Sequence, residues 1–547
     1  MINLLFKLKM FITKLTTARP FIHGTKSCEQ VQLNLLRQII EHNAETKFGI
    51  DNQFSTIANY KDYSSKLPIR EYEDFRPYIL EQAKDENCKA IVNDKILFFN
   101  KTSGTTSEPK LIPVTETVMR GLKRSQALMI YYQYYNRKDA FRGRVVGIAS
   151  PAEEEMSEFG IPIGAASGHF YKSVSKMVRK KYVIPYEVFE IEDYEVKYFA
   201  IALFCLMSKD ISYIATANPT TILKIVEIIN SNKNQILKDL ATGKIDKLDN
   251  DTSEHAAYIN SLIQIDAGRL KELEMLFNRG EKIGFIDLWP NIKLVGTWTG
   301  GSCGIALKAL LTQMPQDVTS IDLGFVASEI RGTVVTNQSS QGGIPTYQDN
   351  FFEFVEKTNF EDGNRDYLLL HQLELGKEYY VIITTKAGLY RYHMNDIMKV
   401  VDFENKCPLL CFIQKGKGVC NITGEKLYEG QLLSALETLN LKTSFIQVVG
   451  DEQKVQYDMY AEFEEEEVNT TDLQSKLDEL LCGQNNEYLE KRKSNRLKPI
   501  QISMLKKGTF EIVKRTAIEE GQREGQYKPV LLQLKNDKMV DLSKHVK

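Results

Sequence analysis

The sequence predicts a large α/β domain with mixed sheets and helices, followed by a smaller α+β domain. Two apolar runs, residues 145–149 and 211–215, have the length and composition of buried strands. The second leads through an Asn-Pro-Thr helix-start signal into a periodic run over residues 222–229. Residues 293–297 and 305–314 repeat this order of strand and then helix. Such a rhythm is typical of domains in which helices cover a parallel or mixed sheet.

The pattern changes after the polar, glycine-bearing residues 414–418, which we interpret as a hinge. Beyond them, residues 445–449 and 457–463 alternate like strands, with a turn expected at residues 450–452. Helical segments follow, and residues 500–505 again have the pattern of a strand. The expected organisation is a large N-terminal domain (1–413), a hinge (414–418) and a small, mobile C-terminal domain (419–547).

The composition is that of an ordinary globular protein, because 43% of the 547 residues are apolar and 26% are charged. The 70 Lys and Arg residues nearly balance the 72 Asp and Glu residues, which gives a net charge of −2. This balance gives no electrostatic reason to expect a nucleic acid partner. Eight cysteines are scattered without a CxxC pair, which favours reduced thiols in the cytoplasm over disulfides or a metal site.

The first fifteen residues are apolar and basic. Lys7, Lys9 and Lys14 interrupt the run. It therefore has too few consecutive apolar residues to span a bilayer, which needs about 20. It also lacks an apolar stretch followed by a cleavage site. We interpret this segment as a helix that packs on the protein, with a helix on a membrane surface as the alternative.

Residues 98–110 carry the strongest chemical pattern, an apolar strand followed by a loop of hydroxyls and glycine that ends at Lys110. Backbone N–H groups and hydroxyls in such a loop approach a polyphosphate closely, while the lysine adds positive charge. The order is not that of a Walker loop. A simple Ser/Thr-rich turn is the alternative. The expected phosphate-binding residues are Ser103, Gly104, Thr105, Thr106 and Lys110.

The order Ser-Gly-Thr-Thr-x-x-Pro-Lys in this loop resembles the phosphate loop of the adenylate-forming superfamily, except that Ser107 replaces a glycine. Residues 322–329 resemble the aromatic-x-x-Ser/Thr-Glu segment of the same superfamily. The resemblance implies that Phe325 stacks on adenine, that Ser328 lies at the nucleotide and that Glu329 helps to hold Mg²⁺. A Ser-Glu pair at a solvated helix start is the alternative.

Residues 388–396 resemble the superfamily segment whose aspartate binds both ribose hydroxyls, which implies that Asp396 is the ribose ligand. Arg391 is a further candidate for nucleotide binding, and we interpret His393 as a spacer. Asn395 replaces the usual glycine, but asparagine tolerates a left-handed backbone, so we expect the turn to persist.

Together with other segments, these patterns identify the chain as similar to the plant auxin-responsive (Gretchen Hagen) acyl-acid amido synthetases and their bacterial relatives. Supporting stretches are Leu67-Pro68-Ile69, Leu288-Trp289-Pro290-Asn291, Phe352-Glu353-Phe354, Thr423-Gly424-Glu425-Lys426 and Gly525-Gln526-Tyr527-Lys528-Pro529. The resemblance covers nearly the whole chain. It implies an enzyme that adenylates a small carboxylic acid with ATP and Mg²⁺, releases pyrophosphate and transfers the acyl group to an amino acid.

The resemblance also implies catalytic roles for Glu329, Lys426 and Lys528, and a monomeric protein. Two rival functions stay open at this point. One is an adenylating ligase whose acceptor is coenzyme A. The other is an inactive nucleotide-binding relative, because Ser107, Asn395 and Lys415 depart from the family pattern. The acyl acid is not indicated by the sequence.

Overall fold

The protein is described here by a computed structural model, which divides into two compact units. It describes residues 2–85, 87–102, 110–174, 176–248, 254–300, 302–361, 363–416, 419–420, 422–423, 425–465, 467–519, 527, 529–535 and 539–547. Unit 1 consists of Met1–Trp298, Gln313–Met394 and Lys399–Cys411. Unit 2 consists of Thr299–Thr312, Asn395–Met398 and Phe412–Lys547. The hinge at residues 414–418 stays a prediction.

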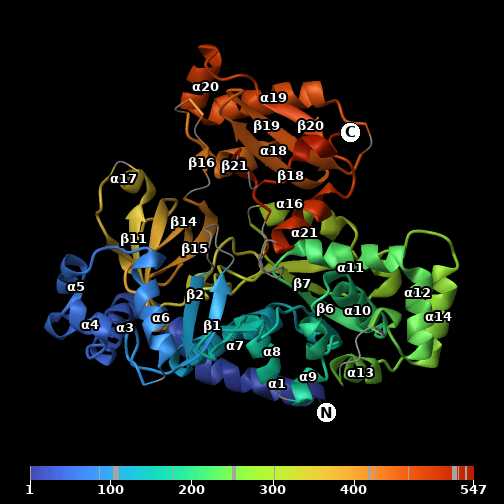
Figure 1. Ribbon diagram of the computed structural model, residues 1–547, viewed down its shortest axis with the longest axis horizontal. Coiled ribbons are helices and arrows are strands. Elements are labelled where there is room, and N and C mark those ends of the chain that lie inside the picture. Colours follow the sequence, from blue (N-terminus) through green and yellow to red (C-terminus); the bar gives the residue numbers. More distant parts are fainter. Residues whose placement is uncertain are drawn as a thin grey trace. The chain divides into compact units, whose positions relative to one another are not determined.

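A four-stranded parallel sheet lies within unit 1 (Figure 1). Its strands, in spatial order, are β3 (Arg144–Gly147), β6 (Ile211–Ala215), β7 (Leu294–Thr297) and β8 (Thr319–Asp322). The three strands predicted here are confirmed as β3, β6 and β7. Ligands commonly bind where the carboxyl ends of such parallel strands meet.

The helices around this sheet follow from their apolar patterns. Helix α10 (Tyr194–Leu206) is apolar on every side from Tyr198 onward, and each residue from Tyr198 to Leu206 is buried, as expected for a core helix. The predicted run 222–229 lies within α11 (Pro219–Ser231), which Asn218 caps by accepting from the Thr220 N–H. Helix α16 (Ser302–Thr312) belongs to unit 2, and it begins and ends earlier than the predicted range 305–314.

A second sheet has the order β2-β1-β5-β4, in which β5 is Pro162–Gly164 and β4 is Glu155–Met156. Strands β1 (Ile96–Thr102) and β2 (Lys110–Thr115) are antiparallel, and their last paired residues are Thr102 and Lys110. The predicted phosphate loop therefore joins two directly paired strand ends. Its residues 103–109 lie outside the described part of the chain.

A buried ion pair ties together distant segments of unit 1. Glu353 on β11 (Asn350–Glu356) and Arg391, which precedes β14 (Tyr392–Glu404), are 0% and 1% exposed. The Arg391 Nε and Nη2 donate to the Glu353 carboxylate at 2.9–3.2 Å. Its Nη1 donates to the backbone carbonyls of Ser64 and Leu67. Burial acts to lower the pKa of Arg391, but the Glu353 carboxylate outweighs it and raises that pKa.

Unit 2 contains a sheet of order β20-β19-β18-β21, in which β21 is Leu532–Leu534. The predicted strands are confirmed as β18 (Thr443–Asp451), β19 (Gln456–Phe463) and β20 (Gln501–Met504). The turn predicted at residues 450–452 is wrong, because the ladder continues to the pair formed by Asp451 and Gln456. The Asp451 carboxylate then accepts from the N–H groups of Gln453 and Lys454, which places the turn after it.

The N-terminal segment forms the predicted helix, α1 (Ile2–Thr13). Its Phe6 ring stacks on Phe141 and meets Tyr134 edge to face, so one side of the helix packs on unit 1 as expected. Within the described residues, none of the helices has the length and apolar character needed to cross a membrane.

We expect Glu353→Gln to lower the free energy of unfolding by about 3–5 kcal/mol, because Arg391 would keep its charge in a buried site without a counter-ion. Urea unfolding followed by circular dichroism measures the change. The matched control is Glu73→Gln, which removes an ion pair with Arg76 in which the carboxylate is exposed, and it should cost at most about 1 kcal/mol. Equal effects of the two substitutions would contradict a special role for the buried pair.

Candidate active site

The segment that contains Phe325 and Glu329 follows the carboxyl end of β8 and folds back on itself. The Asp322 carboxylate accepts from the N–H of Gly324, whose φ of +79° favours glycine. The Phe325 N–H donates to the Thr333 hydroxyl at 2.8 Å, and its carbonyl accepts from the Gly332 N–H. The segment is thus a tight turn at the ligand-binding edge of the parallel sheet.

The Phe325 ring lies directly against Gly332. A Cβ added at Gly332 would stand 2.2 Å from Cδ1 of Phe325, far inside van der Waals contact. Phe325 itself is half-buried. Sequence reasoning identified the aromatic residue but missed the glycine that makes room for its ring. A glycine three residues after the Ser-Glu pair was the available signal.

Strand β1 holds the loop that carries Ser328 and Glu329. The Asn100 side chain donates to the Ser328 carbonyl at 2.7 Å and accepts from the Ala166 N–H at 3.3 Å. The Ser328 hydroxyl donates to the Lys101 carbonyl at 3.4 Å. The strand that enters the predicted phosphate loop is therefore hydrogen-bonded to the predicted nucleotide segment.

Lys110 and Glu329 are linked through Tyr392. The Lys110 ammonium donates to the Tyr392 hydroxyl at 3.0 Å, and this hydroxyl donates to Oε1 of Glu329 at 3.2 Å. The ammonium also lies over the Tyr392 ring, 5.6 Å from its centre. Tyr392 is buried, whereas Lys110 and Glu329 are half-buried. Tyr392 thus links the predicted site residues Lys110 and Glu329. No role was predicted for Tyr392 from the sequence, although it directly follows the candidate Arg391.

The Glu329 carboxylate fits a magnesium ion that is bound mainly by phosphate oxygens. Its Oε1 accepts from Tyr392, and within the described residues no lysine, arginine or histidine forms an ion pair with it. Mg²⁺ at nucleotide sites is commonly held by one or two carboxylates, with phosphates and water as the other ligands. The described part of the chain contains no cluster of three or more His, Cys, Asp and Glu residues that could hold a metal ion.

The third predicted segment is buried. Arg391 is engaged with Glu353 and with backbone carbonyls, so its effect on the site is to fix the residue that follows it, Tyr392. Asn395 has a φ of +57°, which confirms the expected left-handed backbone. Asp396 is 0% exposed on β14, so a ribose can reach its carboxylate only after a local rearrangement. His393 stacks on Phe360 at 5.1 Å.

Of the two predicted catalytic lysines, the structure describes Lys426 but not Lys528. Lys426 is exposed and follows the buried Glu425, which accepts from Tyr457 and from the N–H groups of Ile422 and Thr423. Burial alone would raise the pKa of Glu425, but these hydrogen bonds lower it, so the carboxylate anchors the turn that presents Lys426. Lys528, Ser103, Gly104, Thr105 and Thr106 lie outside the described residues.

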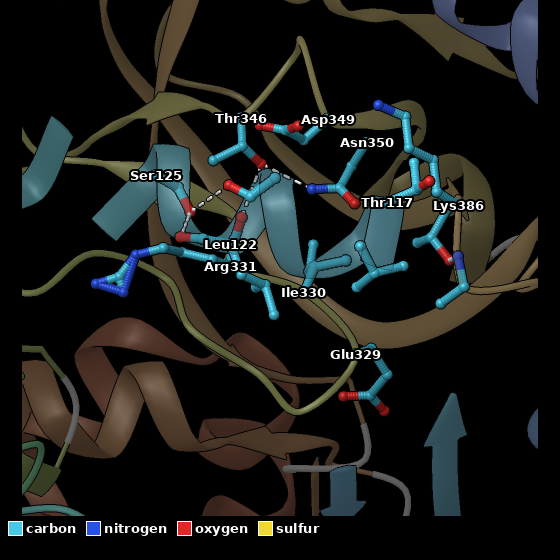
Figure 2. Close-up of a pocket in the computed structure, with 14 residues that line it drawn as sticks. Thr117, Leu122, Ser125, Glu329, Ile330, Arg331, Thr346, Asp349, Asn350 and Lys386 are labelled. Atoms are coloured by element: carbon cyan, nitrogen blue, oxygen red, sulfur yellow. Dashed lines mark hydrogen bonds between the residues drawn. The ribbon is translucent and has the colours of Figure 1, made fainter. Parts of the chain in front are cut away.

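A pocket within unit 1 begins at Glu329 (Figure 2). One face of helix α7 (Glu116–Asn136) forms one wall. Figure 2 shows the Arg331 guanidinium at one side, Lys386 at the opposite side and Glu329 apart from both. The lining residues are Thr117, Val118, Gly121, Leu122, Ser125, Glu329, Ile330, Arg331, Thr346, Asp349, Asn350, Thr385, Lys386 and Ala387.

Two solved structures share this fold. The AtGH3.15 acyl acid amido synthetase in complex with 2,4-DB has a TM-score of 0.84 at 20% identity, over 96% of this chain and 95% of that chain. A 2-hydroxyisobutyryl-CoA ligase in the postadenylation state has a TM-score of 0.53 at 11% identity, over 89% of this chain and 91% of that chain. The chain therefore has the fold of adenylate-forming enzymes.

Two plant enzymes are similar to the chain along most of their length. The indole-3-acetic acid-amido synthetase GH3.4 of Arabidopsis thaliana is 23% identical over 92% of this chain and 89% of the relative. The jasmonoyl–L-amino acid synthetase GH3.5 of Oryza sativa subsp. japonica is 24% identical over 96% of each. Residues 18–317, 343–415 and 431–537 match the GH3 family N-terminal, central and C-terminal domains. The chain belongs to the GH3 family, which confirms the resemblance found in the sequence.

We expect Tyr392→Phe to slow acid-dependent pyrophosphate release by roughly 5- to 150-fold, because it removes two hydrogen bonds that are each worth about 0.5–1.5 kcal/mol. The ring and its packing remain. The control is Tyr488→Phe, which removes a hydroxyl bonded to Asp478 in unit 2 and should leave the rate unchanged. A Tyr392→Phe enzyme with the full wild-type rate would show that the link between Lys110 and Glu329 has no part in the reaction.

Proposed function

We propose that the protein is an ATP-dependent acyl-acid amido synthetase. It adenylates a small carboxylic acid, releases pyrophosphate and transfers the acyl group to the amine of an amino acid. The observation that carries this proposal is the family match, which extends over three successive domains. It is supported by the similar plant enzymes, which are amido synthetases of indole-3-acetic acid and jasmonic acid.

Adenylation requires attack of a carboxylate oxygen on the α-phosphorus of ATP, with the bond to pyrophosphate breaking on the opposite side. Negative charge spreads over the phosphate oxygens, so cations must be held in place before the reaction. Lys110 meets this need, because Tyr392 and the ring beneath the ammonium hold its position. The hydroxyl and glycine residues of the 103–109 loop would bind the phosphates.

Glu329 is the residue that would hold Mg²⁺ next to the phosphates. When bound, the ion supplies charge neutralisation to the phosphoryl oxygens. Phe325 would stack on adenine with its ring supported by Gly332. Asp396 would bind the ribose after a local rearrangement that exposes its carboxylate. Arg391 acts as a positioning residue through Tyr392.

Amide formation requires that the amine and not water attacks the acyl-adenylate. In this proposal the C-terminal domain closes on the site, Lys528 serves adenylation and Lys426 lies near the phosphate. The described residues include no membrane-spanning helix. We place the protein in the cytoplasm as a monomer.

The proposal predicts that the protein exchanges radiolabelled pyrophosphate into ATP only when a suitable carboxylic acid is present. Adding amino acids should then give an amide that mass spectrometry detects. Loss of free thiol with coenzyme A, without amide formation, would assign a CoA ligase instead. No exchange with any acid of a broad panel, despite ATP binding, would assign a catalytically inactive relative.

The role of Lys528 is tested with the same assay. Lys528→Ala should reduce pyrophosphate release on the order of a hundredfold, or roughly 3 kcal/mol of barrier, with ATP affinity nearly unchanged. A presynthesised acyl-adenylate should restore much of the amide formation. The control is Lys544→Ala, an exposed lysine near the end of the chain. Equal impairment with ATP and with the preformed adenylate would exclude this division of labour.

A further inference from the structure

Arg331, two residues after Glu329, lines the pocket described above without an acidic partner. Among the described residues, no carboxylate forms an ion pair with it, and its buried Nε has no hydrogen-bond partner. Its Nη2 donates only to the Met129 sulfur, which is a weak acceptor. Burial lowers the pKa of Arg331 to about 10, with a partial offset from the Tyr213 phenol, so the guanidinium is charged at neutral pH.

A second donor without a partner lies on the same face of α7. Gln133 follows Met129 by one helical turn, so both side chains project from one side of the helix. The Tyr213 hydroxyl donates to Oε1 of Gln133 at 2.7 Å and thereby fixes the amide. The Gln133 Nε2 is buried without an acceptor. Tyr213 thus adjoins two unsatisfied donors, one of them a cation.

A half-buried charge without a counter-ion and a buried amide without an acceptor both cost free energy. Nearly all buried polar groups in proteins have a hydrogen-bond partner, so these two donors indicate a bound ligand that accepts hydrogen bonds from them. An anionic group with two acceptor oxygens would pair with the guanidinium and also accept from Gln133.

We propose that the pocket selects acyl acids that carry a second carboxylate, which Arg331 and Gln133 bind while the reacting carboxylate lies toward Glu329. This inference rests on the proposed function and narrows its substrate class to dicarboxylic acids. Lys386 is the competing cation on the opposite side of the pocket (Figure 2). Its ammonium has no hydrogen-bond acceptor among the described residues, and burial lowers its pKa.

The test compares acids of equal length with one or two carboxylates: hexanoate with adipate, octanoate with suberate, and benzoate with terephthalate. Wild-type protein should prefer at least one diacid in pyrophosphate exchange. Arg331→Met should reduce that preference on the order of a hundredfold, and Gln133→Leu by about tenfold. The ligand-free Arg331→Met protein should melt no lower than wild type, because a half-buried charge without a counter-ion is removed.

Thermal shift with the diacids alone gives a readout that does not depend on turnover. A diacid should raise the melting temperature of wild type but not of Arg331→Met. Exchange with mono- and diacids alike, unchanged in Arg331→Met, would overturn this inference but leave the proposed function intact. Loss of the diacid preference in Lys386→Met but not in Arg331→Met would also overturn the inference, because it would show that Lys386 and not Arg331 binds the second carboxylate.

A second, independent observation concerns helix α1. Its outer face is apolar and exposed: Leu4 is 72% exposed, Leu8 54%, Phe11 57% and Ile12 51%. Their spacing places all four on one stripe of the helix. Met10 is buried and Phe6 packs on Phe141, so the opposite face is the one that contacts the protein.

Positive charge accompanies this stripe. Residues 1–28 contain five Lys and Arg residues and no Asp or Glu, although the whole chain has a net charge of −2. At about 100° per residue, Lys7 and Lys14 lie on one flank of the apolar stripe and Lys9 on the other. Two such helices paired face to face would bring like charges together, which disfavours a second copy of the chain as the occupant.

We infer that α1 lies on an anionic lipid surface, with its apolar stripe in the acyl boundary and its lysines at the headgroups. The full chain should co-sediment with phosphatidylglycerol-containing vesicles, much less with pure phosphatidylcholine vesicles, and less at high salt. Leu8→Gln/Phe11→Gln should cut the bound fraction at least about tenfold.

The matched control is Met275→Gln/Leu375→Gln, which removes two apolar side chains that are exposed elsewhere. It should bind vesicles as wild type does. Equal binding to neutral and anionic vesicles, or no loss of binding in the α1 variant, would overturn the inference. A vesicle-independent dimer that the α1 variant dissolves, detected by light scattering, would assign the stripe to a second copy instead.

Discussion

The site depends on the buried ion pair between Glu353 and Arg391. Through it, one guanidinium binds a carboxylate on β11 and two backbone carbonyls from the segment around Ser64 and Leu67. Arg391 also has a φ of +53°, in the left-handed region that residues other than glycine, asparagine and aspartate rarely adopt. The hydrogen bonds of its guanidinium hold it in this conformation. Because the next residue is Tyr392, the pair fixes the hydroxyl that links Lys110 to Glu329. The buried ion pair therefore helps to fix the positions of the charged side chains of Lys110 and Glu329.

Around the site, the residues with proposed roles in binding or catalysis are fixed by hydrogen bonds from neighbours that have no such role themselves. Asn100 holds the carbonyl of Ser328, Thr333 holds the N–H of Phe325, and Glu425 holds the turn that presents Lys426. Groups fixed in this way need little reorganisation when a ligand binds, which lowers the entropic cost of reaching a reactive geometry.

The sequence was sufficient for features that depend on local order. The strand and helix alternation predicted the parallel sheet. The Ser-Gly-Thr-Thr loop, the Phe-x-x-Ser-Glu segment and residues 388–396 led to the correct family. It was insufficient where the cause lies far along the chain. The contact of Phe325 with Gly332, the burial of Asp396 and the partner of Arg391 are set by tertiary packing. The ladder past Gly450 was missed because a Gly-Asp pair is a common turn, whereas here Asp451 caps a turn that begins after it.

The contact of Gly332 with the Phe325 ring has a consequence for how such a protein can diverge. Residues 329–332 place a carboxylate, two pocket-lining side chains and an obligatory glycine in four consecutive positions. A substitution that reshapes the acid pocket at position 330 or 331 will shift the backbone on which the aromatic ring rests. Selection for a new acid and selection for nucleotide affinity would therefore show strong epistasis here. Divergent acid specificity should accumulate more readily on the α7 wall, where a side chain can change without moving this turn.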